Sequence, residues 1–323
     1  MISKQKNMFR LLRQKLFPIK IILIQTFVLI AILRVKLKKH RLIIVVEQSY
    51  AGYFAQLTWL VFLIYYCKKL RFKPMVYLRD KRYNTGSSFI NDILQSRFET
   101  CWREDDFINK KVIRIKHPVY LPFFKSIVRN MSHENEKDII SQYLKPSERI
   151  EEAVADYILE NSLDDYIGVH FRGTDKHREA PIVRVETFLQ EIRIRVLSTK
   201  KFYKNIYLAS DSEIQLNRIS NLVSREFPWL ICNSYNAIRS EANLSLLYSR
   251  DFSIEEQIRL GDDALIECLI LSKADLLIRN SSNLSNFCIF FNLNLEVVNL
   301  NKPYKLQNSF PNLKSFLKTL GED

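Results

Sequence analysis

The stretch Asp165-Tyr-Ile-Gly-Val-His-Phe-Arg-Gly-Thr-Asp-Lys-His-Arg-Glu-Ala-Pro181 decides how this chain of 323 residues folds. Its first part, residues 166–171, is mostly apolar and has the length typical of a buried strand. Charged side chains then follow at once, from Arg172 to Glu179. Open α/β sheets build ligand sites in this place, because the carboxyl ends of their strands open into a crevice. The stretch therefore predicts a strand that delivers a charged loop to a binding site.

Strand and helix patterns alternate on both sides of this stretch. Downstream, the sequence predicts strands at 205–210, 229–233, 275–279 and 295–300, and helices near 184–198, 213–226, 262–273 and 282–291. Upstream it predicts strands at 42–46 and 74–78, a long amphipathic helix between them that ends at Cys67, and an exposed strand at 111–116. Strands separated by helices of this length indicate a parallel, doubly wound sheet. A helix after Ser147, running through Glu160, is the candidate hinge between two halves.

Composition and charge exclude several classes of protein. The chain is 47% hydrophobic and 26% charged, which is a globular composition and not a disordered one. Its net charge of +14 is concentrated at the start, where residues 1–41 hold 11 Lys or Arg and no acidic residue. The remainder is close to neutral, which argues against an extended nucleic-acid track and favours an anionic membrane surface as the partner of residues 1–41.

Residues 1–41 have three interpretations. The uncharged run from Ile21 to Leu33 has 13 residues, fewer than the roughly 20 that cross a bilayer core. A basic helix lying in the membrane interface fits this pattern best, and a core helix or a true membrane-spanning helix remains as an alternative. We accordingly expect a cytoplasmic protein at the periphery of the membrane, or alternatively a single-pass anchor.

Cysteine and glycine usage excludes further kinds of site. The five cysteines are widely spaced and mostly lie in apolar runs, so reduced, packed thiols are expected in place of disulfides or a zinc site. With six glycines in all, the chain has neither a Gly-x-Gly-x-x-Gly fingerprint nor a P-loop. A bound nucleotide would have to be held by side chains and helix N-termini.

Polar residues that follow the predicted parallel strands should converge at one edge of the sheet. Arg172 is the strongest candidate, because a guanidinium at a strand end can bind a diphosphate and stabilise a charged leaving group. Ser281 and Ser282 would add the N-terminus of a helix to an anion site. Glu179, with Lys176 nearby, could be a general base or simply part of a surface ion pair. The full set is His170, Arg172, Asp175, Lys176, Glu179, Asp211, Arg279, Asn280, Ser281 and Ser282.

Three blocks in order resemble the alpha-1,6-fucosyltransferase and NodZ-type group. The first is Gly168-Val-His-Phe-Arg-Gly-Thr-Asp-Lys176 with Glu179-Ala180, the second is Ile206-Tyr-Leu-Ala-Ser-Asp211, and the third spans Gly261 to Asn292. Gly52 to Gln56 is a looser similarity. Residues 1–41 and 79–160 have no corresponding motif.

The resemblance implies a fold, an activity and roles for individual residues. The fold would be GT-B, with two Rossmann-like domains facing a cleft: residues 42–160 for the acceptor and 161–323 for the donor, after the membrane-associating segment 1–41. The enzyme would be inverting and metal-independent, with no cofactor besides GDP-fucose as donor substrate. His170 and Glu267 would recognise guanine, while Arg172, Ser281 and Ser282 would bind the pyrophosphate. Asp211 would lie in the donor pocket, and Lys176 and Glu179 would form the base relay.

The chain departs from the family pattern at three places. Gly173 replaces the second arginine of the family's pair, the loop to Glu179 is one residue shorter, and Glu267 replaces an aspartate. The leading hypothesis is therefore a transferase that moves fucose or a related sugar from a GDP-sugar to a hydroxyl of a glycan or glycolipid. The alternative is a non-catalytic nucleotide-binding or glycan-binding protein with the same fold.

Overall fold

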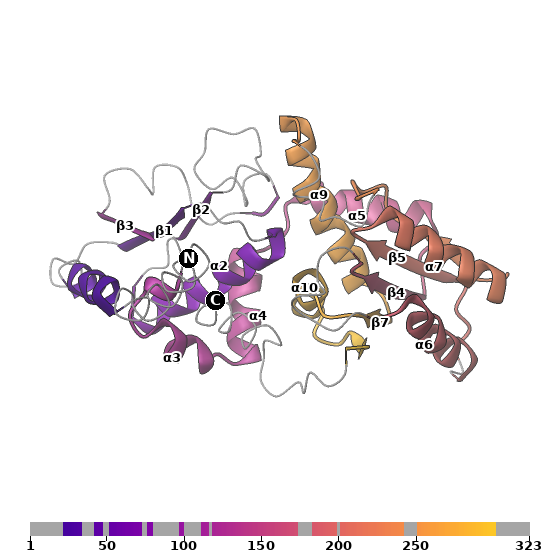
Figure 1. Cartoon of the computed structure of the whole chain (residues 1–323), viewed down its shortest axis with the longest axis horizontal. Helices are drawn as coiled ribbons and strands as arrows, with labels where there is room; N and C mark the ends of the chain where they lie inside the picture. Colours follow the sequence, from indigo (N-terminus) through magenta and orange to yellow (C-terminus); the bar gives the residue numbers. More distant parts are fainter. Residues whose placement is uncertain are drawn as a thin grey trace, which may run out of the picture.

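The computed structural model describes residues 22–33, 42–47, 52–72, 76–79, 97–99, 111–115, 118–173, 183–198, 201–241 and 251–301. They form a mixed α/β structure with two separate parallel sheets (Figure 1). The smaller sheet has the order β2-β1-β3 and contains β1 (Leu42–Glu47), β2 (Val76–Arg79) and β3 (Lys111–Ile115). The larger has the order β6-β5-β4-β7-β8. Its strands are β4 (Tyr166–Phe171), β5 (Asn205–Ser210), β6 (Ile231–Asn233), β7 (Leu276–Arg279) and β8 (Glu296–Asn299).

The central strand of the larger sheet is β4, which forms the first part of the stretch 165–181. Its residues alternate between the two faces of the sheet, as the period of a strand requires. Ile167, Val169 and Phe171 enter one hydrophobic cluster, against α6 (Val185–Ser198) and α7 (Glu213–Glu226). Tyr166 enters the other cluster, together with residues of α9 (Ile254–Ser272) and α10 (Asn283–Phe291). The residues that alternate with Val169 and Phe171, including His170, therefore face α9 and α10.

Gly168 sets the distance between β4 and the end of α9. A Cβ atom at this position would lie 3.1 Å from both Ala274 Cβ and Leu271 Cδ2. That spacing is tighter than ordinary van der Waals contact, so the glycine lets the helix lie close against the sheet. The close approach carries the rest of α9, including Glu267, over the same face as His170.

Several helix boundaries differ from those that the sequence predicts. α9 begins at Ile254, eight residues before the expected start, and a capping box of Ser253 and Glu256 fixes that beginning. α2 (Tyr53–Lys69) begins at its N-cap Gly52. The prediction that this helix is amphipathic is wrong, because almost every side chain from Tyr53 to Cys67 is buried. A helix that is hydrophobic all round is a core helix.

The chain between β3 and β4 forms further helices. These are the short η3 (Pro118–Tyr120), α3 (Phe124–Arg129), α4 (His133–Tyr143) and α5 (Glu148–Glu160). The predicted helix after Ser147 is α5, and Ser147 is its N-cap. α5 packs on α9, beside the larger sheet (Figure 1). The boundary between halves at residues 160 and 161 stays a prediction.

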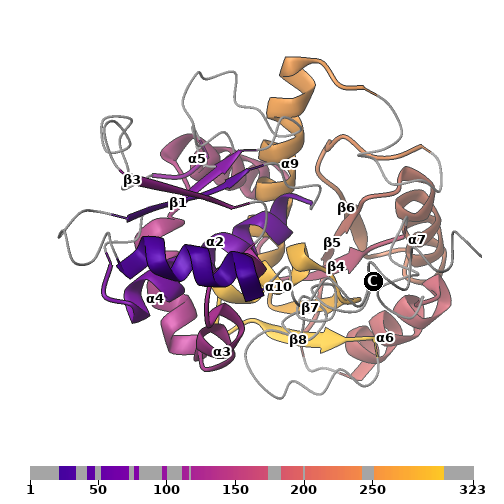
Figure 2. The ribbon, with the colours of Figure 1, turned by 60° about the vertical axis from the view of Figure 1, so that its left-hand side comes forward.

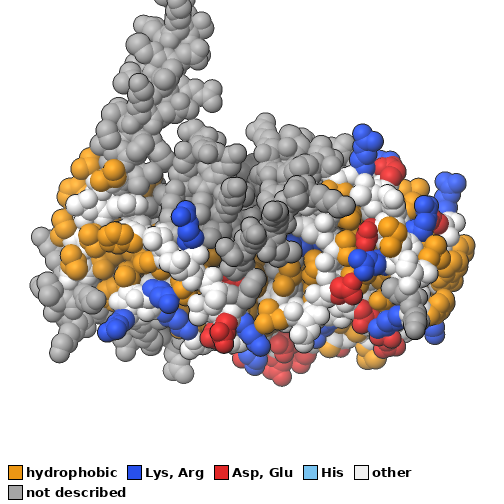
Figure 3. Space-filling view, turned by 90° about the horizontal axis from the view of Figure 1, so that it is seen from below, with side chains coloured by type: hydrophobic (Ala, Val, Ile, Leu, Met, Phe, Trp, Pro, Cys, Tyr) orange, Lys and Arg blue, Asp and Glu red, His pale blue; other side chains and the backbone are white. Residues whose placement is uncertain are grey.

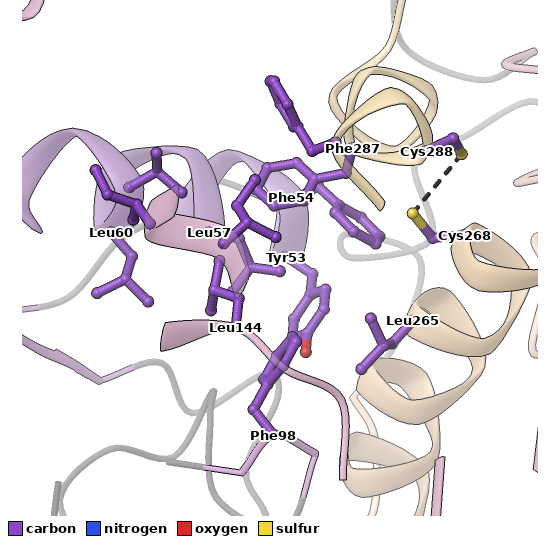
Figure 4. Packing of buried hydrophobic residues seen from close by; sticks show 14 of the residues in the cluster. Tyr53, Phe54, Leu57, Leu60, Phe98, Leu144, Leu265, Cys268, Phe287 and Cys288 are labelled. Atoms are coloured by element: carbon purple, nitrogen blue, oxygen red, sulfur yellow. Dashed lines mark hydrogen bonds between the residues drawn. The ribbon is translucent and has the colours of Figure 1, made fainter. Parts of the chain in front are cut away.

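α9 and α10 lie between the two sheets in both ribbon views (Figures 1 and 2). One hydrophobic cluster runs through this region and joins Ile44 of the smaller sheet to Tyr166 and Tyr207 of the larger one. In Figure 4 the ring of Phe54, from α2, points to that of Phe287, from α10, and the ring centroids are 5.3 Å apart. Arg97 adds a polar tie, since its Nε lies 2.7 Å from Asp262 Oδ1 on α9. The two sheets are thus joined by a common core.

Two sequence predictions concern the N-terminal segment and the cysteines. Residues 22–33 are helical, and residues 1–21 and 34–41 lie outside the described residues. Within the described ranges, every helix is too short or too polar to cross a membrane. Cys67, Cys268 and Cys288 are buried free thiols, and Cys232 is a partly buried one. The prediction of packed cysteines is confirmed for Cys67, Cys268 and Cys288, their reduced state stays a prediction, and Cys101 lies outside the described residues.

Candidate functional site

The candidate site lies at the carboxyl edge of the larger sheet. All five strands are parallel, so the residues that follow them meet at one edge, as predicted. The register places His170 of β4 beside Arg279 of β7, while Asp211 directly follows β5. The sequence between β7 and α10 brings Asn280, Ser281 and Ser282 to the same edge.

Arg172 is fixed by neighbours from two other strands. Its backbone N–H donates to Asn280 Oδ1 (2.9 Å), and the Asn280 amide donates back to the Arg172 carbonyl (3.0 Å). The guanidinium Nε lies 3.5 Å from Asp211 Oδ2, and the N–H of Gly173 donates to Asp211 Oδ1 (2.9 Å). Both side chains of the ion pair are partly exposed. The guanidinium is therefore held at the edge of the sheet and remains accessible to a ligand.

The N-terminus of α10 lies at the same edge, two residues after Asn280. Ser282 is its N-cap and accepts a hydrogen bond from the Ser285 N–H (3.1 Å). Its hydroxyl also lies 3.5 Å from His170 Nδ1, which joins the helix start to β4. The Ser281 N–H donates to Asn301 Oδ1. Helix N-termini attract anions, because unpaired N–H groups and the helix dipole both favour negative charge.

Glu267 projects from α9 into a buried polar cluster beneath the site. Its carboxylate forms an ion pair of 2.5 Å with Arg239, and the two side chains are 9% and 5% exposed. Burial raises the pKa of the Glu267 carboxyl to about 7; Arg239 opposes this rise, and Asp263 and Asp211 add to it by repulsion. The roles predicted for Glu267 and Asp211 in nucleotide binding stay predictions.

Two residues of the site were not assigned a role from the sequence. Arg239 lies in the segment between β6 and α9, where no motif or periodicity marks it, and only the folded structure reveals its partner. Asn280 was noted as a strand-end residue, but its two hydrogen bonds to the Arg172 backbone depend on the parallel pairing of β4 and β7. A polar residue directly after a strand was the available signal.

Gly173 occupies a position with little room for a side chain. A Cβ atom here would lie 2.8 Å from Phe171 Cε1 and 3.0 Å from Gln215 Cγ. Phe171 is itself buried and packs edge-to-face on Phe188, with 5.0 Å between ring centroids. The departure from the family's arginine pair therefore coincides with a local packing that is built around glycine.

Three predicted residues cannot be placed. Asp175, Lys176 and Glu179 belong to the segment 174–182, which lies outside the described residues, so their predicted roles stay predictions. Within the described ranges, no group of three or more His, Cys, Asp or Glu side chains is arranged to hold a metal ion.

No protein-family model matches the sequence, and no curated protein sequence does so either. Solved structures do match. NodZ alpha-1,6-fucosyltransferase co-crystallised with GDP shares 16% identity and a TM-score of 0.52, over 82% of this chain and 96% of the other. Fucosyltransferase NodZ from Bradyrhizobium shares 17% identity and a TM-score of 0.50, over 77% and 92%. The resemblance drawn from the three sequence blocks is thus confirmed in the fold: the chain has the α/β fold of the NodZ fucosyltransferases.

Proposed function

We propose that this protein is an inverting glycosyltransferase that moves fucose, or a related sugar, from a GDP-sugar to a hydroxyl of a glycan or glycolipid. The observation that carries the proposal is the position of Arg172, held at the end of the central strand beside the N-terminus of α10. A guanidinium beside a helix N-terminus suits a diphosphate leaving group. Similarity to the fold of NodZ, one structure of which contains GDP, supports the same donor.

The residues of the site divide between nucleotide binding and transfer. Arg172, Ser281 and Ser282 would bind the diphosphate, and Asp211 would hold Arg172 in place. His170 and Glu267 would contact the guanine, with Arg239 favouring the ionised carboxylate that accepts hydrogen bonds. In the transfer, the acceptor oxygen attacks the anomeric carbon, the bond from that carbon to the diphosphate breaks, and GDP leaves. Glu179, assisted by Lys176, would take the acceptor's proton.

A comparison of Arg172→Ala and Glu179→Gln tests this proposal. GDP should raise the melting temperature of the unaltered protein more than UDP or dTDP, because a ligand stabilises the state that it binds. Arg172→Ala should weaken GDP binding by about tenfold or more, since it removes charge-assisted hydrogen bonds, and abolish release of GDP from GDP-fucose. Glu179→Gln should keep GDP binding and lose transfer.

Arg218→Ala is the matched control, because Arg218 is an exposed arginine on α7 that pairs with Glu186 on α6. Full turnover by Arg172→Ala would refute the proposal. GDP binding without turnover by the unaltered protein, over a panel of acceptors, would favour the non-catalytic alternative, which the missing arginine at Gly173 supports. We further propose that no metal is required; loss of turnover in EDTA and its return with Mg²⁺ would contradict that.

We also propose that the N-terminal segment 1–41 binds an anionic membrane surface from the cytoplasmic side. The helix at 22–33 has five exposed large hydrophobic side chains: Ile22, Leu23, Phe27, Ile30 and Leu33. In Figure 3 the end of the molecule that holds this helix (left) shows hydrophobic and basic side chains, whereas the other end shows hydrophobic, basic and acidic side chains mixed together. Apolar exposure next to basic residues is typical of helices that lie in a membrane interface.

Sedimentation with lipid vesicles tests this second proposal. The protein should bind phosphatidylcholine vesicles that contain phosphatidylserine and should bind pure phosphatidylcholine vesicles less. Phe27→Ser should reduce binding, because it removes a side chain that is 72% exposed. The control is Phe202→Ser, where a side chain 65% exposed lies in the other half of the chain. Equal loss in both variants, or no dependence on phosphatidylserine, would refute the proposal.

A further inference from the structure

Two arginines are fully buried in the described part of the chain, and they differ in their partners. Both Arg97 and Arg279 are 0% exposed. Arg97 has a carboxylate, Asp262, 2.7 Å from its Nε, and it donates from Nη2 to the carbonyl of Ile258. Arg279 has no acidic partner among the described residues. Its Nη1 donates to Ser285 Oγ (3.0 Å) and to Asn286 Oδ1, while its Nε and Nη2 have no hydrogen-bond partner there.

The charge of Arg279 is poorly compensated in its surroundings. Burial lowers the pKa of its guanidinium to about 10. A guanidinium at that pKa still carries its charge at neutral pH. Buried charges in proteins are normally paired, because the loss of hydration is costly without a counter-charge. Among the described residues Arg279 therefore lacks the counter-charge that a buried guanidinium normally has, and ionisable groups in perturbed surroundings cluster at functional sites.

Arg279 lies at the N-terminus of α10, where a positive charge is unfavourable. Its two partners, Ser285 and Asn286, belong to the first turn of α10, so the guanidinium lies under the positive end of the helix dipole. A cation is unfavourable at a helix N-terminus. An anion bound at that end would relieve both the unpaired charge and the unfavourable dipole. Arg279 is also the register partner of His170, so it lies on the face of the sheet that leads to the proposed nucleotide site.

We propose that Arg279 is the second cation of the diphosphate site, acting from beneath the first turn of α10 where position 173 supplies no charge. It is a positioning residue: it holds the helix start through Ser285 and Asn286 and adds positive potential beneath the proposed diphosphate site. Gly173 lacks room for the family's second arginine, and Arg279 supplies the charge from a different strand. The proposal rests on the proposed GDP-sugar donor.

Arg279→Met in the full-length protein tests it, because methionine fills the space of the arginine stem without a charge. Dissociation constants for GDP, guanosine and inorganic pyrophosphate are measured by titration calorimetry, and the melting temperature without ligand is recorded. Affinity for GDP and pyrophosphate should fall by about tenfold or more, the effect of losing a buried charged group, while guanosine binding should stay unchanged. The ligand-free protein should melt at the same temperature or higher. Arg279→Lys should restore most of the GDP affinity.

Arg97→Met is the matched control, since it removes a buried arginine that has a carboxylate. It should lower the melting temperature and leave the ratio of GDP to guanosine affinity unchanged. The proposal is overturned if Arg279→Met binds GDP like the unaltered protein, or loses GDP and guanosine affinity equally. It is also overturned if Arg279→Met and Arg279→Gln both fail to fold, because the arginine would then be holding the structure.

The same titrations separate this proposal from the proposed function. If the unaltered protein binds pyrophosphate in a way that depends on Arg279 but does not bind GDP, the role of Arg279 in an anion site stands and the proposed GDP-sugar donor is refuted. If the unaltered protein binds neither GDP nor pyrophosphate, both proposals fall. If it binds GDP and Arg279→Met does so equally well, the donor stands and the role of Arg279 is refuted.

Discussion

At the scale of single residues, Gly173 contacts both the hydrophobic core and the polar residues at the carboxyl edge of the larger sheet. Its N–H holds Asp211, which in turn pairs with Arg172, and its missing side chain leaves room for the ring of Phe171. A side chain at this position would move either the ring or the backbone. Movement of the backbone would shift the Asp211 carboxylate with it, so the glycine also keeps Arg172 in position.

Gly173→Ala should destabilise the protein by about 1–3 kcal/mol, the usual cost of overpacking a core. Chemical denaturation measures this free energy. Phe171→Leu should cost stability by itself, but adding Gly173→Ala to that variant should cost much less, because the smaller side chain leaves space for the new methyl group. Additive costs in this double-mutant cycle would show that the collision with Phe171 is not the cause.

The sequence could predict site residues where a strand end placed them. His170, Arg172, Asp211, Ser281 and Ser282 lie in or directly after strands of one parallel sheet, so the order of elements was enough to bring them together. Arg239 could not be found in this way, because its role comes from a contact between an irregular segment and α9. Nor could the sequence show that Arg279 has no acidic partner among the described residues, since this depends on every element packed around the side chain.

At the scale of elements, α9 is the helix that connects the site to the rest of the molecule. Its C-terminal part covers β4 and carries Glu267, while its N-terminal part carries Asp262, the partner of Arg97. The guanidinium of Arg97 crosses α9 at Gly261, where an added Cβ would lie 2.4 Å from Arg97 Cζ. It also lies over the ring of Tyr53, 5.6 Å from the centroid. The absence of a side chain at Gly261 thus lets the buried guanidinium of Arg97 pack against α9.

Gly261→Ala should destabilise the protein, although the same change in an ordinary helix stabilises it by up to about 1 kcal/mol. The reason is that Arg97 would have to leave its place between Asp262 and Tyr53. Thermal or chemical denaturation gives the change in stability. In an Arg97→Ala background the substitution should become neutral or stabilising. A stabilising effect in the unaltered protein would mean that Arg97 has room to move.

Element boundaries were predicted best where apolar periodicity changes sharply. The bounds of β4, β5 and α7 agree with the sequence prediction residue for residue. The start of α9 was missed, although Ser253 and Glu256 form a capping box with a recognisable sequence, because the predicted helix was confined to its most apolar part. α2 was expected to have a polar face, and tertiary packing on all sides overrides that expectation.

At the scale of the whole molecule, a buried carboxyl on α4 couples stability to pH. Glu136 is 0% exposed, and burial raises the pKa of its carboxyl from 4.5 to about 9. Between these two values the unfolded chain releases the proton and the folded chain keeps it. Stability should therefore fall as the pH rises through this range.

Glu136→Gln should raise the free energy of unfolding at pH 8, by up to a few kcal/mol, and flatten its decline between pH 5 and pH 8. Glutamine keeps the shape of the side chain and cannot ionise. Urea denaturation at a series of pH values measures both effects. Glu134→Gln, at an exposed position on the same helix, is the control and should leave the slope unchanged. An unaltered slope in Glu136→Gln would place the pH dependence elsewhere.

The common core of α2, α9 and α10 limits how this protein can be divided. The rings of Phe54 and Phe287 meet where the two halves join, and the hydrophobic cluster continues through both. A fragment that begins at residue 161 would keep every strand of the larger sheet and yet place the aromatic side of α10 in water. Such a fragment should aggregate or be degraded. A chimera with another protein of this fold would therefore have to match the side chains on both sides of this contact.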